Sequence, residues 1–228
     1  MTPRRPCLAI DGPVGSGKST VARLVAHRLG FTYVDSGAMY RALAWAARAR
    51  GIGPAEPERV SQLLDTVDLR LDPQPDGINR VMVSGRDITE EIRSPEIGQL
   101  ASEFSEMPAV REWMVALQQA MAREGGVVME GRDIQTVVLP DAEIKIFLIA
   151  PAEERARRRW LELRERGFDA DLDEVLAEIQ ARDHRDSNRA HSPLRAADDA
   201  VHLDTGGMDI EQVVQRVLEI AGERNLRP

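Results

Sequence analysis

The sequence predicts an α/β fold in which a parallel sheet is flanked by helices. Short apolar runs typical of buried strands alternate with amphipathic helical patterns along the 228 residues. A glycine-rich segment joins the first of these strands to the first helix, as in folds that bind ligands at the carboxyl ends of parallel strands. Residues 56–104 depart from the alternation, which predicts a small inserted lobe.

The first half of the chain supplies two strand and helix units followed by the insertion. The expected core elements are a strand at 7–11, a helix closed by Gly30, a strand at 31–35 and a helix from Ser36 to Gly51. Within the insertion we expect a short amphipathic helix, an extended segment at 68–71 and an alternating antiparallel strand at 80–83.

The second half returns to the core pattern. The expected elements are a helix from Pro108 to about Glu124, buried strands at 127–129 and 144–149, an arginine-rich helix from Pro151 to about Gly167, a helix from about Leu172 to Arg182, a polar loop, a strand at 201–203 and a helix from Ile210 to Leu226. The chain therefore divides into a core (5–55, 105–150 and 185–226), the inserted lobe (56–104) and a helical lid (151–184).

The composition restricts the possible functions. A net charge of -8 argues against extended binding to nucleic acid, which requires a positive surface. The single Cys7 cannot form an internal disulfide and predicts a cytoplasmic setting, and no apolar stretch is long enough for a signal peptide or a membrane span. Lys18 and Lys145 are the only lysines beside 28 arginines, a bias that fits a GC-rich genome or a hot habitat.

Residues 12–19 match the pattern G-x-x-x-x-G-K-[ST] at every fixed position. Backbone N–H groups of such a loop surround phosphate oxygens, while Lys18 reaches the β and γ phosphates of ATP and the Ser19 hydroxyl binds Mg²⁺. A plain glycine-rich turn would explain the glycines but not the lysine. The predicted ATP site comprises Gly12, Pro13, Val14, Gly15, Ser16, Gly17, Lys18, Ser19 and Thr20.

The loop alone does not distinguish a metabolic kinase from a GTPase switch or an ATP-driven motor. A kinase for a small acceptor must hold a second anion, and Tyr40-Arg41 lies one helical turn after Asp35-Ser36-Gly37 at the end of the second strand. An arginine there can bind an acceptor phosphate, although a solvated helix arginine is the simpler alternative. For Asp35, orienting a metal-bound water and capping the helix are equally plausible roles.

Three segments and the inserted lobe resemble the bacterial cytidylate kinase family of P-loop kinases. The segments are Val34-Asp35-Ser36-Gly37-Ala38-Met39-Tyr40-Arg41, Glu130-Gly131-Arg132-Asp133-Ile134-Gln135-Thr136-Val137-Val138, and Arg182-Asp183-His184-Arg185-Asp186-Ser187-Asn188-Arg189. The resemblance extends from about Leu8 to Val217. Gln135 stands where the family more often has glycine, so the loop after Asp133 is expected to differ in its contacts.

The resemblance implies the following site. The acceptor phosphate is held by Arg41, Arg132 and Arg189, cytosine by Ser102, Arg111 and Asp133, and the ribose by Arg182 and Asp186, with Ser36 and Tyr40 also contacting the acceptor. The chemistry is consistent, because the cytosine N4 amine donates to a carboxylate while N3 and O2 accept from a guanidinium. Uracil reverses the donor and the acceptor at positions 4 and 3 of the ring, because it has an oxygen at position 4 and an N–H at position 3. Taken singly, each of these residues could instead be a surface ion pair or a solvated helix residue.

The segment 151–167 carries six arginines and four glutamates. Three expected i, i+4 ion pairs, Glu153–Arg157, Glu154–Arg158 and Glu162–Arg166, account for half of the arginines. Of the other three arginines, Arg155 and Arg159 lie one turn apart on a common face. We expect them to close over the ATP phosphates, so that Lys18, Arg132, Arg155, Arg159 and Arg189 form the catalytic set and no general base is needed.

The resulting prediction is a monomeric enzyme that uses ATP and Mg²⁺ to phosphorylate cytidine monophosphate (CMP) and deoxycytidine monophosphate (dCMP). Another nucleoside monophosphate or shikimate is the alternative acceptor. A GTPase switch would need an N-K-x-D segment, which a chain with two lysines at these positions lacks. An RNA-binding role for the arginines of 155–195 is disfavoured by the acidic total and by the interleaved carboxylates.

Overall fold

The computed structural model describes residues 4–74 and 77–224, so the expected helix end at Leu226 lies outside the described residues. A five-stranded sheet in the order β2-β6-β1-β7-β8 forms the centre, and all of its neighbouring strands are parallel. Its strands are β1 (Cys7–Asp11), β2 (Thr32–Asp35), β6 (Val127–Gly131), β7 (Ile144–Ile149) and β8 (Val201–Asp204). The predicted fold class is confirmed.

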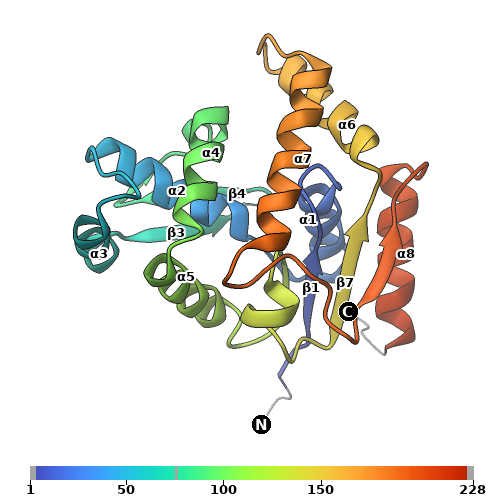
Figure 1. Ribbon diagram of the computed structural model, residues 1–228. Helices are drawn as coiled ribbons and strands as arrows, with labels where there is room; N and C mark the ends of the chain where they lie inside the picture. The colour runs from blue at the N-terminus through green and yellow to red at the C-terminus, as the bar shows by residue number, and fades with distance from the viewer. Residues whose placement is uncertain (1–3, 75–76, 225–228) are drawn as a thin grey trace.

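Helices cover both faces of this sheet because successive strand residues point to opposite sides. In β1, Ile10 packs with Val25 and Val217 beneath α1 (Lys18–Leu29) and α8 (Ile210–Glu223). The neighbouring Ala9 packs with Met39 and Met114 beneath α2 (Ser36–Ala49) and α5 (Pro108–Met121). Figure 1 shows α8 and α2 on opposite sides of the strands. No helix among the described residues is long and apolar enough to cross a membrane.

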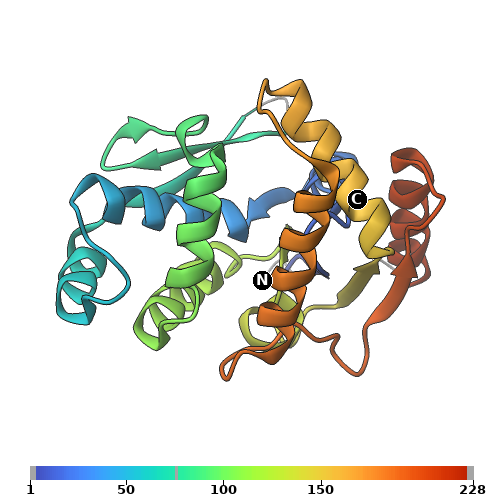
Figure 2. The ribbon, with the colours of Figure 1, turned by 45° about the horizontal axis from the view of Figure 1, so that its top comes forward.

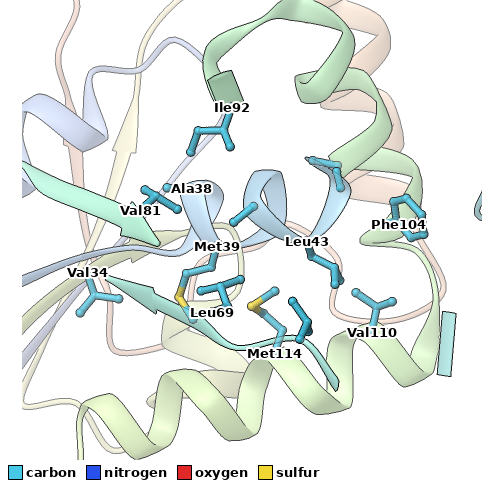
Figure 3. Packing of buried hydrophobic residues seen from close by; sticks show 14 of the residues in the cluster. Val34, Ala38, Met39, Leu43, Leu69, Val81, Ile92, Phe104, Val110 and Met114 are labelled. Atoms are coloured by element: carbon cyan, nitrogen blue, oxygen red, sulfur yellow. The ribbon is translucent and has the colours of Figure 1, made fainter. Parts of the chain in front are cut away.

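The segment between β2 and β6 adds a second, antiparallel sheet. Its elements are α3 (Pro57–Thr66), β3 (Leu69–Pro73), β4 (Asn79–Val83), β5 (Arg86–Asp87), the 3-10 helix η1 (Glu91–Arg93) and α4 (Pro95–Phe104). Leu69, Val81 and Phe104 join the same apolar cluster as Met39 and Met114, so this sheet shares the core of α2 and α5 (Figure 3). In Figure 2 the small sheet and α5 lie on opposite sides of α2.

Helix α4 is an element that the sequence reading missed. Ser94 caps it by accepting a hydrogen bond from the N–H of Ile97, and Pro95 occupies the first helical position. This start signal was available in the sequence. A π-helix, η2 (Ile134–Val138), was also not anticipated, because its backbone is held by a residue distant in the sequence: Asp11 accepts hydrogen bonds from its first two N–H groups.

Two helices, α6 (Ala152–Glu165) and α7 (Leu172–Asn188), form a hairpin with its own small apolar cluster of Ala156, Leu163, Val175 and Ile179. The prediction that a polar loop begins after Arg182 is wrong, since α7 continues through Asn188. The last two turns of α7 are polar, and some of their residues line the cleft described below. This part of the sequence therefore lacks the apolar periodicity of a helix and resembles a loop.

Candidate active site

A cleft of about 840 Å³ lies at the carboxyl ends of β2 and β6, between the small sheet and the α6–α7 hairpin. Among the described residues, its lining includes ten arginines and Lys18 against seven carboxylates, in a chain whose net charge is -8. A locally positive cleft attracts anionic ligands. Every predicted site residue contributes to this lining except Gly12, Pro13 and Arg155.

The glycine-rich loop has a geometry that only its glycines permit. A Cβ on Gly12 would lie 2.2 Å from the carbonyl oxygen of Leu148, and Gly15 and Gly17 have φ values of 74° and 86°. Helix α1 begins directly afterwards at Lys18, so its free N–H groups and positive end are directed at the loop. The residues present therefore fit the triphosphate of ATP.

Lys18 is folded back onto this loop. Its Nζ donates hydrogen bonds to the Pro13 carbonyl oxygen (2.7 Å) and to Ser16 Oγ (3.3 Å). Burial, with a further contribution from the positive charge of Arg132, lowers the pKa of Lys18 to about 7. A phosphate placed beside the amine would restore its preference for the charged form.

Ser19, the predicted Mg²⁺ ligand, donates a hydrogen bond of 2.6 Å to Glu130 Oε1. Glu130 begins the segment 130–138 that resembles the family, but no role was predicted for it from the sequence. It lies at the end of β6, where the register places it beside Asp35 of β2. Burial, together with the nearby charge of Asp35, raises the pKa of Glu130. Its position at a strand end next to the phosphate loop was the signal that could have identified it.

Asp35 caps helix α2 and supports Arg41. Its Oδ1 accepts the N–H of Ala38 at 2.7 Å, and its Oδ2 lies 3.3 Å from an Arg41 guanidinium nitrogen. The capping alternative is therefore confirmed. A Cβ on Gly37 would lie 3.1 Å from Arg41, so the absence of a side chain there admits the guanidinium. Ser36 lines the cleft, but its hydroxyl donates to the Glu130 carbonyl oxygen at 2.6 Å.

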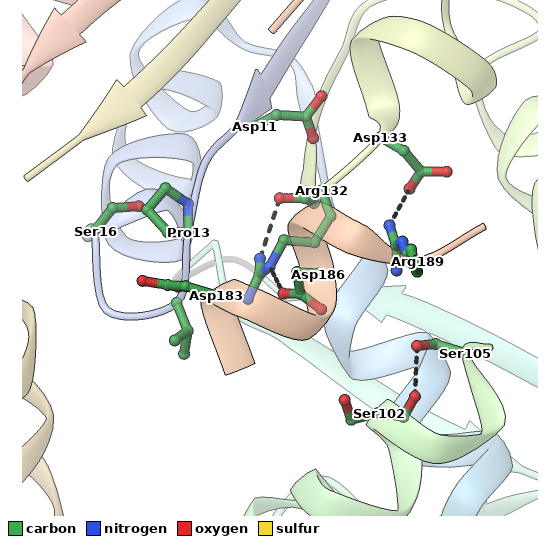
Figure 4. Close-up of polar contacts among 12 residues, drawn as sticks. Asp11, Pro13, Ser16, Ser102, Ser105, Arg132, Asp133, Asp183, Asp186 and Arg189 are labelled. Atoms are coloured by element: carbon green, nitrogen blue, oxygen red, sulfur yellow. Dashed lines mark hydrogen bonds and ion pairs between the residues drawn. The ribbon is translucent and has the colours of Figure 1, made fainter. Parts of the chain in front are cut away.

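Arginines and carboxylates from distant segments meet beyond the loop (Figure 4). Arg132 Nε donates to Asp186 Oδ2 at 3.0 Å, and an Arg189 guanidinium nitrogen lies 4.0 Å from Asp133 Oδ1. Burial opposes ionisation of Asp186, but the nearby arginines prevail and lower its pKa. Asp186 is buried and bonded to Arg132. The alternative that Arg182 and Asp186 form an ordinary i, i+4 ion pair at the surface is therefore wrong.

Two of the guanidinium groups that line the cleft have nitrogens that donate no hydrogen bond to the residues that the structure describes. Arg182 Nε and one terminal nitrogen of Arg189 are buried and have no hydrogen-bond partner within the described part of the chain. Burial is the main cause that lowers the pKa of Arg182 to about 10, and it also lowers the pKa of Arg189. Buried unpaired donors are costly in a folded protein, so their retention at the cleft points to an anionic ligand.

The residues implied for cytosine recognition also converge. Ser102 on α4 and Arg111 on α5 are both buried, and Arg111 forms a short ion pair with Asp133 and donates to the Ser105 carbonyl oxygen at 3.2 Å. Arg111 is therefore not a solvated helix residue. Tyr40 lines the same part of the cleft, and burial raises its pKa to about 12.

Comparisons with known proteins agree with this arrangement. A family model described as cytidylate kinase matches residues 8–223. The chain belongs to the cytidylate kinase family.

A cytidylate kinase from Pelotomaculum thermopropionicum is 52% identical over 213 residues, which cover 93% of this chain and 94% of that protein. A cytidylate kinase from Syntrophotalea carbinolica is 48% identical over 221 residues, covering 97% and 94% respectively. A crystal structure of an uncharacterized protein from Eubacterium ventriosum, with a TM-score of 0.52 and 14% identity, covers 96% of this chain and 99% of that one and shows a similar fold only.

Gln135, for which the sequence predicted altered contacts in the loop after Asp133, is fully buried. Its Nε2 donates to the Ile146 carbonyl oxygen at 2.6 Å, and its Oε1 accepts the N–H of Ala197 at 3.3 Å. The side chain thus ties the loop after Asp133 to β7 and to the segment that joins α7 to β8. A glycine would leave these two backbone groups without the partner.

Arg155 and Arg159 on α6 were both expected to be free to contact the ATP phosphates, and the structure places them differently. Arg155 is not free above the cleft: it is buried and donates hydrogen bonds to Ala150, Val14 and Asp183. Arg159 does line the cleft, and it pairs with Glu162 at 2.9 Å.

Of the expected i, i+4 pairs, Glu154–Arg158 and Glu162–Arg166 form, at 3.3 Å and 3.2 Å. Glu153 and Arg157 do not form an ion pair in the described structure, so the third expected pair is wrong.

The part of the cleft beside α8 was missed by sequence reasoning. Arg158, assigned only to an ion pair, lines the cleft and donates to the Thr205 carbonyl oxygen at 3.0 Å. Met208 and Ile210 line the same region, and Ile210 is 41% exposed. Both the exposure of Ile210 and its place beside the phosphate loop depend on the tertiary structure, so no local sequence signal identified this region.

Proposed function

We propose that this chain transfers the terminal phosphoryl group of ATP to CMP or dCMP, producing ADP and the corresponding diphosphate. The observation that carries the proposal is the Arg111–Asp133 pair, which lies in the same cleft as the phosphate loop. Figure 4 shows Arg132 between the loop residues Pro13 and Ser16 on one side and Asp133 and Arg189 on the other. A pair that can bind a base, a cluster that can bind a phosphate and a loop that can bind ATP follow one another along the cleft. This arrangement suits a nucleoside monophosphate acceptor.

Asp133 and Arg111 present an acceptor next to a donor, which is the complement of the cytosine edge. The N4 amine of cytosine would donate to Asp133, while N3 and O2 would accept from Arg111. Uracil would place an oxygen against the Asp133 carboxylate and an N–H against the guanidinium. Buried groups left unpaired in this way lower affinity strongly, so uridine monophosphate (UMP) should be the poorer acceptor.

The acceptor phosphate would be held by Arg41, Arg132 and Arg189, with Arg182 and Asp186 at the ribose. One of its oxygens attacks the γ phosphorus in line, and the bond from that phosphorus to the β–γ bridging oxygen breaks to release ADP. The acceptor phosphate is ionised at neutral pH, so no general base is required. The chain contributes orientation and positive charge, chiefly from Lys18, Arg132 and Arg159.

The Ser19 hydroxyl and the Glu130 carboxylate offer the oxygen donors that Mg²⁺ prefers, with Glu130 acting through water. When bound there, Mg²⁺ would neutralise charge on the β and γ phosphates. Arg158, Met208 and Ile210 would hold the donor adenine between a guanidinium plane and apolar side chains.

This function assigns roles to the parts of the chain. Residues 56–104 would serve as the acceptor-binding lobe and residues 151–184 as a lid that closes over ATP and excludes water. We further propose that the enzyme acts as a monomer, as its resemblance to the cytidylate kinase family suggests, and in the cytoplasm, where its nucleotide substrates are found.

The test is ADP formation from ATP and Mg²⁺ with CMP, dCMP, UMP, adenosine monophosphate, guanosine monophosphate and shikimate offered separately. A no-acceptor control and a Lys18→Ala protein complete the design. Turnover with CMP and dCMP that disappears in Lys18→Ala is the expected result. Preference for another acceptor would retain the phosphate chemistry but overturn the roles given to Arg111 and Asp133.

A further inference from the structure

Arg155 connects three segments that are far apart in the sequence. Its Nε donates to the Ala150 carbonyl oxygen (2.9 Å), one terminal nitrogen donates to the Val14 carbonyl oxygen (3.0 Å), and the other donates to Asp183 Oδ2 (2.6 Å). The side chain is 6% exposed and does not line the cleft. Its three contacts are therefore internal to the protein, and none faces the nucleotide.

The tip of the phosphate loop rests directly on the first turn of α6. A Cβ on Gly15 would lie 3.0 Å from the Arg155 carbonyl oxygen and 3.1 Å from its Cβ. Val14 packs against the apolar cluster formed by α6 and α7. The loop tip thus has both an apolar and a polar attachment to the α6–α7 hairpin.

Asp183 extends the connection to α7. Its Oδ2 accepts from Arg155, while its Oδ1 is buried and has no hydrogen-bond partner in the described residues. Figure 4 shows Asp183 on the part of α7 near the loop residue Pro13, with Asp186 further along the same helix. Arg182 and Asp186, which flank Asp183 on α7, belong to the acceptor end of the cleft.

We propose that Arg155 is a positioning residue that fixes the tip of the phosphate loop to both lid helices and so aligns the donor phosphates with the acceptor end. The inference rests on the proposed function. Because Arg158 and Arg159 follow within one turn of α6, the same anchor determines where these two cleft-lining arginines stand relative to the loop. Arginine suits the task because its rigid fork of five donors can bond three acceptors at once, whereas lysine is a single point charge.

The proposal predicts a selective defect. Without the anchor, the loop tip and α6 would lose their fixed relation, and small misplacements of reacting groups reduce rates steeply. We expect Arg155→Met to lower kcat by about tenfold or more and to raise the KM for ATP, because displacements on the order of 1 Å have effects of this size. Equilibrium binding of CMP alone should change less than twofold, since the acceptor contacts themselves remain.

The experiment compares four variants with the parent chain by steady-state kinetics, by calorimetric binding of ADP and of CMP separately, and by thermal unfolding. Arg155→Met and Arg155→Lys test the anchor, and we expect lysine to restore little because it cannot make all three bonds. Asp183→Asn keeps the two backbone contacts of Arg155 and should cause the same defect in milder form, about threefold in kcat, as expected for one weakened hydrogen bond. Arg157→Met is the matched control, because this exposed arginine lies on the same helix and outside the cleft; it should behave as the parent does.

Unchanged kcat and unchanged ADP affinity in a folded Arg155→Met protein would overturn the proposal, as would full rescue by lysine. If Arg155→Met does not fold, a parent-like Asp183→Asn would overturn it instead. A parent chain without CMP-dependent turnover would defeat the proposed function, while the ADP-binding comparison would still test whether Arg155 positions the loop.

Discussion

Ser19 Oγ and Glu130 Oε1 are joined by a hydrogen bond of 2.6 Å that links the start of α1 to the end of β6. The bond brings the hydroxyl expected to bind Mg²⁺ together with a buried carboxylate whose pKa is raised by burial. The pair is possible because β1, which leads into the phosphate loop, is the direct neighbour of β6 in the sheet. An anion and a hydroxyl so placed suit a metal ion and its water ligands.

Replacing Glu130 by glutamine should therefore weaken the metal-dependent reaction while preserving the shape of the site. We expect the apparent Mg²⁺ affinity or kcat to fall by about 10- to 100-fold, the usual effect of removing a group that orients a metal ligand. Titration of activity with Mg²⁺ at saturating ATP checks this. Glu143→Gln provides a matched control, because the Glu143 carboxylate accepts the N–H of Cys7 at the start of β1 and does not line the cleft.

Nucleotide binding should be accompanied by proton uptake at Lys18. Burial lowers the pKa of this amine to about 7, so at pH 8 most of the free protein carries it neutral, and donor phosphates would favour the ammonium form. ADP binding should take up close to one proton at pH 8 and almost none at pH 6. Calorimetry in buffers of different ionisation enthalpy measures the uptake.

Lys18→Met should abolish the proton uptake, whereas Lys145→Met should retain it, since Lys145 pairs with Asp199 away from the cleft. Equal uptake in the parent and in Lys18→Met would show that another group titrates. The same shift affects stability. The pKa of Lys18 in the folded protein lies below the ordinary lysine value of 10.5, so charged Lys18 destabilises the fold, and this penalty declines as the pH rises from about 7 toward 10.5.

Asp133→Asn should relax the preference for cytosine. The asparagine amide can donate to the O4 of uracil, whereas its interaction with the cytosine amine loses the charge. We expect kcat/KM for CMP to fall by about 10- to 100-fold, corresponding to the 1–3 kcal/mol of a good base contact. The ratio of CMP to UMP values should fall as well. A variant that keeps the parental ratio would remove Asp133 from base recognition.

Arg159→Ala should lower kcat with little change in CMP affinity, because Arg159 lines the cleft from α6 and the proposed function places it at the ATP phosphates. Arginines that stabilise the transferred phosphoryl group contribute on the order of 10³-fold in related chemistry. Single-turnover kinetics would separate this step from product release. Arg164→Ala is the control, as Arg164 is exposed on the same helix and contacts Trp160 and Asp169. A parental kcat in Arg159→Ala would exclude the lid role.

Gln135→Ala should reduce stability more than activity. It removes two buried hydrogen bonds, each worth roughly 1 kcal/mol, and leaves the Ile146 carbonyl without the amide donor. The midpoint of thermal unfolding should fall by about 4–8 °C for a chain of this size. Gln62→Ala, at an exposed site on α3, should shift it by less than about 1 °C. Equal effects of the two substitutions would contradict the bridging role of Gln135.

Local patterns in the sequence predicted much of the fold and the site. The phosphate loop was identifiable because the glycines, Lys18 and Ser19 act within one continuous turn, and the strands that flank it are short apolar runs. Helix α4 was missed although its start signal is local, whereas two other predictions failed where distant segments decide the outcome. Asp11 binds the first N–H groups of the π-helix at 134–138, and the polar end of α7 is bonded through Asp183 and Asp186 to Arg155 and Arg132. Neither set of contacts has a local signature in the sequence.

The arginines show the same division. The sequence by itself determined the two-sided α/β architecture, the phosphate loop and the residue types available to bind anions, because these depend on periodicity and spacing along the chain. Only the tertiary structure decided which arginine does what. Arg155 and Arg159 are one helical turn apart, yet packing of the phosphate loop against α6 buries the first and leaves the second in the cleft. Burial and hydrogen-bond partners are set by contacts between distant segments, which spacing along one helix does not encode.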